Sequence, residues 1–95
     1  MKRVLKWDVP VDSRFHDIGA GKVIHVGVQL PQQTMTTVQV WTEEDENAEV
    51  PTREAIAFGT GQDIPNELLH AGTTLDGPFV WHIYAKASPS WWVRT

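Results

Sequence analysis

The sequence predicts an all-β protein, a small antiparallel sandwich or barrel of about six to seven strands. Apolar and polar residues alternate along several short segments, which is the period-two pattern of strands. These segments recur at intervals of about 8–15 residues, and glycine, proline, aspartate or asparagine lies between them. No stretch keeps the periodicity of a long helix. Because 95 residues make one domain, we expect a single all-β domain over residues 1–87 and an apolar, tryptophan-containing C-terminal arm over residues 88–95.

Three strands are expected in the N-terminal third of the chain. Arg3–Val9 alternates and ends at Pro10, and its lysine and proline suit the edge of a sheet. Arg14–Ile18 is a short second strand, and a glycine turn at Gly19–Gly21 leads into Lys22–Leu30. The Lys22–Leu30 segment has the cleanest alternation in the chain, with Ile24, Val26, Val28 and Leu30 on one face and Val23, His25, Gly27 and Gln29 on the other.

The middle of the chain contains one strand and then an acidic segment. Met35–Thr42 is rich in β-branched residues, and its pattern places Val38 and Val40 inward. Residues 43–51 are acidic and have no apolar period, which predicts a solvated, mobile hairpin tip. This run lacks the glycine and the ligand spacing of a calcium loop.

The next elements lead to the last strand. Thr52–Phe58 is expected to be a strand with Ile56 and Phe58 on its core side. Asp63–His70 is either one helical turn or an ordered loop over an open end of the sheet. Ala71–Gly77 then returns as a short extended segment.

Pro78–Ala85 has the strongest strand composition, because it is rich in β-branched and aromatic residues. Both of its faces are apolar or aromatic, so we expect a central strand that lies between its own core and a second surface. One face carries Phe79, Trp81 and Ile83, and the other carries Val80, His82 and Tyr84.

Composition and charge exclude several classes of protein. Twelve acidic and eight basic residues give a net charge of −4 without a basic stripe, which argues against binding to nucleic acid. No apolar run approaches the ~20 residues of a membrane span, so no membrane partner is expected. The chain has no cysteine, which excludes disulfides and thiolate chemistry and fits a reducing cytoplasm.

The motifs that suggest ligands have plainer explanations. Gly19–Lys22 lacks the first glycine and the hydroxyl residue of a phosphate loop, and no helix follows it, so a turn is expected. The amides of a Gly59–Asp63 loop could hold an anion, and in that case Gly59, Thr60, Gly61, Gln62, Asp63 and His82 are the candidate ligand-binding residues.

The histidines and serines do not predict a metal site or a nucleophile. The four histidines have no metal-binding spacing, although His25 and His82 lie on outer strand faces and could meet on one surface. No Gly-x-Ser-x-Gly elbow is present. We therefore expect neither a catalytic residue, nor a metal, nor a cofactor.

The tryptophans are the strongest functional signal. Five in so short a chain is a high number, and tryptophan is enriched where proteins meet. They either fill a small core or lie in part at an intermolecular contact. We favour the contact and assign it to Trp81, Tyr84, Trp91, Trp92 and Val93.

Several short motifs, spread over residues 3–85, carry a resemblance. They are Lys6-Trp7 with Val9-Pro10, the Val38–Trp41 segment, Phe58-Gly-Thr-Gly61 followed by Ile64-Pro65, and Phe79-Val-Trp-His82. In these motifs the chain resembles a family of small uncharacterised proteins encoded by tailed bacteriophages, and the residues beyond Ala85 depart from that pattern. The resemblance implies a phage origin, and hence a place in the host cytoplasm or on the virion. It implies no activity.

We therefore expect a non-enzymatic phage accessory protein that acts through protein–protein contacts, with itself as a homo-oligomer and with a host or virion protein as a further partner. One alternative is a virion component, such as a capsid decoration or a tail-associated module. The other is a protein that binds a small ligand or a nucleotide signal.

Overall fold

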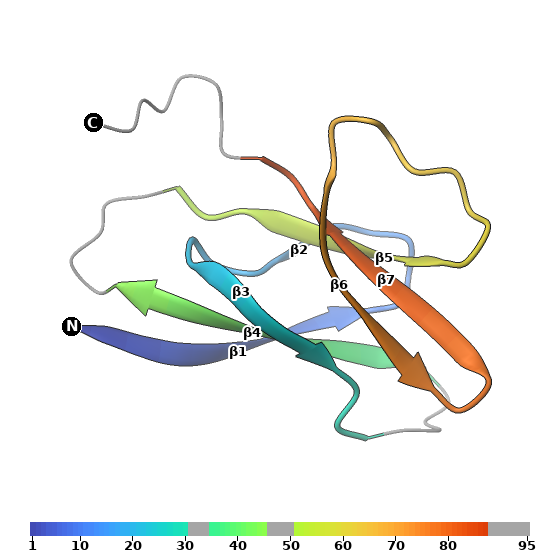
Figure 1. Ribbon diagram of the computed structural model, residues 1–95, viewed down its shortest axis with the longest axis horizontal. Helices are drawn as coiled ribbons and strands as arrows, with labels where there is room; N and C mark the ends of the chain where they lie inside the picture. The colour runs from blue at the N-terminus through green and yellow to red at the C-terminus, as the bar shows by residue number, and fades with distance from the viewer. Residues whose placement is uncertain (31–34, 46–50, 88–95) are drawn as a thin grey trace.

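In the computed structural model, which describes residues 1–30, 35–45 and 51–87, seven strands form two antiparallel sheets (Figure 1). The first sheet has the strand order β1-β4-β3 and the second has the order β2-β5-β7-β6. The all-β class is confirmed, and these residues contain no helix that could cross a membrane. The strands are β1 (Lys2–Pro10), β2 (His16–Asp17), β3 (Lys22–Gly27), β4 (Thr37–Asp45), β5 (Glu54–Gly59), β6 (Leu69–Asp76) and β7 (Phe79–Ala85).

The position of two strands in their sheets agrees with their composition. β1, with its lysines and terminal proline, lies at the edge of the first sheet. β7 lies between β5 and β6, so the strand that is apolar on both faces is central. The expected arm, residues 88–95, lies outside the described residues.

The edges of the two sheets adjoin, which gives a flattened, partly open barrel. β3 contacts β6 on one side of the core, and β1 contacts β2 on the other (Figure 1). At the first junction a Cβ on Gly72 would lie 2.4 Å from Val26 Cγ2. Only glycine therefore lets the second sheet approach the first this closely.

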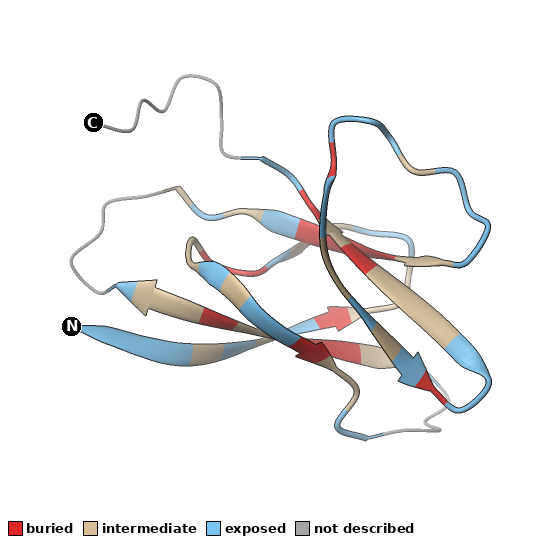
Figure 2. Cartoon of the chain, viewed as in Figure 1, coloured by how far each residue is buried: buried red, intermediate tan, exposed pale blue. Residues whose placement is uncertain are grey.

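The core lies between the inner faces of the sheets (Figure 2). Trp7 packs against it and donates from Nε1 to Thr42 Oγ1 at 2.9 Å, so the buried threonine hydroxyl is satisfied. The buried apolar residues of this core cluster are Val9, Ile18, Val26, Val38, Val40, Ala55, Ala57, Ile83 and Ala85.

The inner face of β5 differs from the expectation, which was wrong in placing Ile56 and Phe58 on the core side. Ala57 pairs with Ile83, and paired residues share a face, so the alanines face the core. Ile56 and Phe58 are on the opposite, outer face. Ile56 is nevertheless buried there, beside its pairing partner Tyr84.

The alternation of β3 is interrupted by a β-bulge between Val23 and His25. Val23 pairs with Thr42 and Val26 with Val40, so both face the core although they are an odd number of residues apart. Ile24 and Leu30 are exposed, and the apolar face expected for Lys22–Leu30 is therefore only partly correct. A bulge inserts one residue and changes the phase of the pattern.

Two connections also differ from their expectations. The hairpin tip expected from Glu43 onward is wrong for Glu43–Asp45, which continue β4 in pairing with β1, and Lys2 forms an ion pair with Glu43 at 3.2 Å. Residues 46–50 lie outside the described residues. Residues 60–68 form an ordered loop and not a helical turn, with Leu68 buried at its end.

The chain passes from the first sheet to the second through a turn at Asp12. The Asp12 carboxylate accepts hydrogen bonds from the Arg14 amide at 3.0 Å and from His16 Nε2 at 2.9 Å. The hydrogen bond from His16, more than that from Arg14, lowers the pKa of the Asp12 carboxyl from its ordinary value.

A lowered pKa in the folded state gives a stability contribution that is complete above the unfolded pKa of about 4 and is lost as the pH falls through the folded pKa. We expect Asp12→Asn to be less stable than the wild type at pH ~5.5. The difference should shrink toward zero as the pH is lowered below the range in which the carboxyl titrates. Urea unfolding at a series of pH values measures it, and a difference that stays constant with pH would contradict this assignment.

Gly72→Ala should lower the free energy of unfolding by about 1–3 kcal/mol, because the new methyl group overlaps Val26. Gly27→Ala is the control, since its nearest neighbour would be the movable end of His25 at 3.3 Å. Urea denaturation of both variants measures the cost. The Val26→Ala background removes the methyl group at 2.4 Å but keeps the Cβ at 2.8 Å, so it should relieve part of the Gly72→Ala penalty. Strict additivity of the two changes would exclude the overlap.

Candidate functional site

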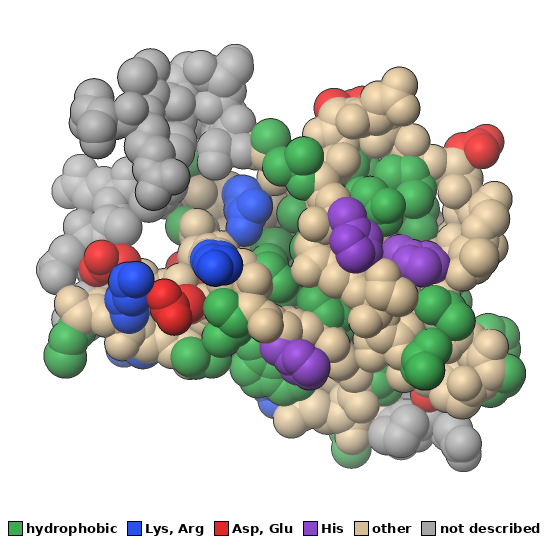
Figure 3. Space-filling model, in the orientation of Figure 1, with side chains coloured by type: hydrophobic (Ala, Val, Ile, Leu, Met, Phe, Trp, Pro, Cys, Tyr) green, Lys and Arg blue, Asp and Glu red, His purple; other side chains and the backbone are tan. Residues whose placement is uncertain are grey.

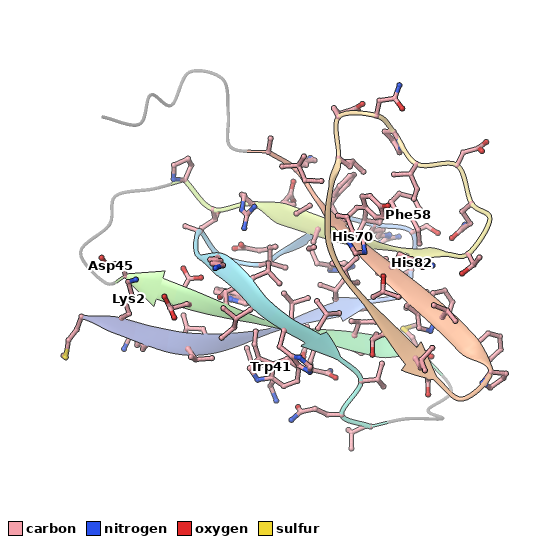
Figure 4. All side chains as sticks on the ribbon, in the orientation of Figure 1. Lys2, Trp41, Asp45, Phe58, His70 and His82 are labelled. Carbon is pink, nitrogen blue, oxygen red and sulfur yellow. The ribbon has the colours of Figure 1, made fainter. Side chains whose placement is uncertain are left out.

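The outer face of the four-stranded sheet gathers polar and aromatic side chains from β5, β6 and β7. His82 pairs with Phe58 on one side and with Thr73 on the other, and Tyr84 pairs with His70. All five therefore lie on one face, opposite to Ile83 and the core. Figure 4 shows Phe58, His70 and His82 close together below the loop that follows β5.

Four of the side chains on this surface form a continuous hydrogen-bonded chain, which we call the His–Thr network. Thr60 Oγ1 lies 2.9 Å from His82 Nε2, and His82 Nδ1 lies 3.0 Å from Thr73 Oγ1. Thr73 Oγ1 also lies 2.9 Å from His70 Nε2. The network crosses from the end of β5 over β7 to β6, so it forms only when all three strands are paired.

Two arrangements of protons, each the reverse of the other, satisfy every bond of this network with neutral rings. In one, His82 donates from Nδ1 to Thr73, Thr73 donates to His70 Nε2, and Thr60 donates to His82 Nε2. Reversing all the donors satisfies it equally well. Both ring nitrogens of His82 are thus engaged by hydroxyl groups of the protein itself.

Aromatic contacts flank the network. The rings of Phe58 and Tyr84 meet edge to face at 5.8 Å and 77°, and those of His70 and Tyr84 at 5.2 Å and 65°. Edge-to-face geometry places ring edges against π faces and stabilises such pairs. Tyr84 is therefore part of an internal aromatic cluster on the outer face and is half-buried there.

The candidate ligand loop is largely occupied by its own contacts. The Gly59 amide donates to Gln62 Oε1, and the Gln62 amide donates to the Gly59 carbonyl at 3.3 Å. Gly61 has a φ of +91°, which glycine adopts without strain, and Asp63 is exposed. Of the predicted ligand residues, Thr60 and His82 meet directly, whereas Gln62 closes the turn.

The predicted partner residues are divided between two faces. Trp81 pairs with Gly59 and Thr74 on the core side of β7, while Tyr84 is on the outer side. Trp81 stacks on Phe79 at 6.0 Å and 22°. Trp91, Trp92 and Val93 lie outside the described residues.

A hollow with a volume of 450 Å³ lies at the Phe79 end of β7. The exposed side chains of Leu75 and Phe79 lie at this end, on either side of the Gly77-Pro78 turn, and hydrophobic side chains gather there in the space-filling view (Figure 3). We call Leu75, Pro78, Phe79, Val80 and Trp81 the hairpin patch.

His25 and His82 do not come together. His25 is on β3 of the first sheet and packs on the Trp41 ring at 5.3 Å, whereas His82 belongs to the His–Thr network of the second sheet. Within residues 1–30, 35–45 and 51–87, no three metal-ligating side chains are grouped in a way that could hold an ion.

Sequence reasoning missed Phe58, His70 and Thr73 as members of the outer surface. The sequence predicts Phe58 in the core, His70 at the end of the Asp63–His70 segment and Thr73 in the short extended segment that follows it. A second β-bulge between His70 and Gly72 aligns His70 and Thr73 on one face. A β-bulge does not show in a period-two pattern, so the sequence does not place His70 and Thr73 on one face. The only sequence signal for this surface is the presence of histidine and threonine side chains in these segments.

The fold and this surface define a small two-sheet all-β domain with its polar and aromatic cluster on one sheet face. The chain belongs to a protein family described as a domain of unknown function, DUF7352, whose model matches residues 1–92. No curated protein and no solved structure matches the chain.

Thr73→Val should cost about 1 kcal/mol of stability, because it removes both hydrogen bonds of the central hydroxyl and keeps the side-chain shape. Thr74→Val, one residue along and on the other face, is the matched control and should cost less. Urea unfolding gives the free energies. The ring nitrogen chemical shifts of His70 and His82 should change in Thr73→Val alone, and unchanged shifts would exclude the network in solution.

Proposed function

We propose that the protein is a non-enzymatic accessory protein that acts through protein–protein contacts and associates with copies of itself. The hairpin patch is the observation that carries this proposal. Leu75 is 67% exposed and Phe79 is 58% exposed, although both are large and apolar and lie in a paired hairpin. Phe79 is on the face of β7 that carries Trp81, whereas Leu75 pairs with Val80 on the opposite face, so the tip of the hairpin is apolar on both faces. Exposed apolar surface of this kind marks interaction sites.

The chemistry of the patch suits a flat protein surface better than a deep small-molecule site. Phe79 stacks on Trp81 and so presents a broad aromatic face that is held in place from below. Aromatic residues are enriched at the centres of interfaces. Burial of Leu75 and Phe79 by a partner would contribute about 1.5–3 kcal/mol for each side chain.

The His–Thr network supports a role without catalysis. Both nitrogens of His82 are within hydrogen-bond distance of threonine hydroxyls, and His70 Nε2 is also engaged. Each His82 nitrogen is thus bonded to a hydroxyl group of the same domain, which suits a structural role for the ring. We assign the network to holding β5, β7 and β6 in register beneath the binding surface.

The Phe79–His82 segment, which carries part of the resemblance to phage proteins, runs from the hairpin patch to the network. We propose a phage protein that works in the host cytoplasm or on the virion, with itself and a host or virion protein as partners. Trp91, Trp92 and Val93 remain proposed contact residues of the same interface.

Light scattering over a range of protein concentrations tests self-association. We expect the wild type to form a dimer or a larger oligomer, and the double variant Leu75→Ser, Phe79→Ser to weaken it by about 30-fold or more in dissociation constant, the effect of ~2 kcal/mol lost at an interface anchor. Deletion of residues 88–95 should weaken association further.

The control is Val4→Ser with Ile24→Ser, which removes two exposed apolar side chains from the first sheet. It should leave association unchanged, and circular dichroism should show that all variants are folded. A wild type that stays monomeric at every concentration would contradict the homo-oligomer. Equal weakening of association by both double variants would show that the hairpin patch has no specific role in the interface.

A further inference from the structure

A second hollow, with a volume of 270 Å³, lies at the other end of β7, between β3 and β6. Two cationic side chains, Lys22 and Arg53, line it together with His70. Its apolar wall includes Val23, Leu69 and Ala71. Among the described residues no carboxylate lines it, and basic and hydrophobic side chains lie side by side over this region in the space-filling view (Figure 3).

Arg53 is held rigidly at the rim. Its amide donates to the Gly19 carbonyl at 2.8 Å, and its carbonyl accepts from the Ile18 amide at 3.0 Å. Its guanidinium donates from Nη2 to the Gly21 carbonyl at 2.9 Å. This hydrogen bond fixes the orientation of the planar guanidinium, and its remaining N–H groups are left for other acceptors.

Lys22 is positioned by the same glycine. The Glu44 carboxylate accepts from the Ala20 amide at 3.2 Å and from the Gly21 amide at 2.8 Å, which fixes the turn immediately before Lys22. A Cβ on Gly21 would lie 2.2 Å from the Glu43 carbonyl oxygen, so only glycine fits. Gly21 thus positions both cations. It directly precedes Lys22 in the chain, and its carbonyl accepts the hydrogen bond from Arg53.

The nearby carboxylates are engaged elsewhere. Glu43 pairs with Lys2 at 3.2 Å, Glu54 pairs with Lys86 at 3.0 Å, and Glu44 accepts the two turn amides. Among the described residues neither Lys22 nor Arg53 has an ion-pair partner. The two cations therefore lie beside an apolar wall, while the hydrogen bonds and ion pairs of the neighbouring carboxylates are made with other groups.

We propose that this hollow binds a small organic anion, with its phosphate or carboxylate group between Lys22 and Arg53 and a short apolar body against Val23, Leu69 and Ala71. Arginine and lysine together supply charge-assisted hydrogen bonds to such a group. The volume is at the lower limit of small-molecule sites, which restricts the ligand to a compact one. This site lies at the opposite end of β7 from the hairpin patch and does not depend on the proposed protein–protein contact.

Amide chemical-shift titrations of the full chain with butyl phosphate, pentanoate, inorganic phosphate and butanol test the site. Butyl phosphate or pentanoate should give saturable shifts at Gly21, Lys22, Arg53, Leu69 and Ala71. The tighter of these two identifies the anionic group. Inorganic phosphate should bind more weakly because it lacks the apolar body, and butanol should not bind because it lacks the charge.

Lys22→Gln should weaken the tighter probe by about tenfold, which corresponds to the loss of one charge-assisted hydrogen bond. Lys6→Gln is the matched control, because Lys6 bonds to Gln29 on the first sheet, and it should bind as the wild type does. Arg53→Lys keeps the positive charge but loses the planar, multiple-donor guanidinium group, so it should also weaken binding.

Saturable shifts at these amides that Lys22→Gln and Arg53→Lys weaken would support the site. The inference is overturned if neither organic anion gives saturable shifts there, if butanol binds as well as the anions do, or if Lys6→Gln weakens binding as much as Lys22→Gln. Because Lys22 is exposed, its variant should fold, and an unchanged affinity would count directly against the proposal.

Discussion

The register of β7 between β5 and β6 is the constraint on which the rest of the structure depends. Pairing of Ile83 with Ala57 and Gly72 places one face of the sheet on the core. The same register brings His82 between Phe58 and Thr73 on the opposite face. A slip of one residue would expose Ile83 and bury His82, so core packing and the outer surface are specified together.

Small residues make this register compatible with a closed core. The alanines of β5 and Gly72 of β6 face the valines of the first sheet, and the approach of Gly72 to Val26 brings the edges of the two sheets together. The larger side chains of β5, Ile56 and Phe58, are then available to the outer face. The second face of β7 is therefore covered by an aromatic cluster and not by solvent alone.

The surfaces described above are arranged along one strand. The hairpin patch lies at the Phe79 end of β7, the His–Thr network in its middle, and the basic hollow at its Ala85 end. A strand of this length spans roughly 20 Å. A partner on the patch and a small anion in the hollow could therefore occupy the protein together, with the network holding β7 in register between them.

The sequence by itself determined the all-β class, the edge position of β1 and the central position of β7, because period-two alternation, proline and aromatic content are local properties. It also placed Thr60 and His82 in one candidate site. Only the tertiary structure decided which face of β5 is buried. Ala57 faces the core because it pairs with Ile83, and Ile56 faces outward because it pairs with Tyr84, and nothing in the local sequence specifies these partners. The two β-bulges likewise shift the phase of β3 and β6, and this brings His70 and Thr73 to His82 and Val23 to the core. Such pairings join residues distant in the chain, and the energy that selects them comes from packing across the sheets.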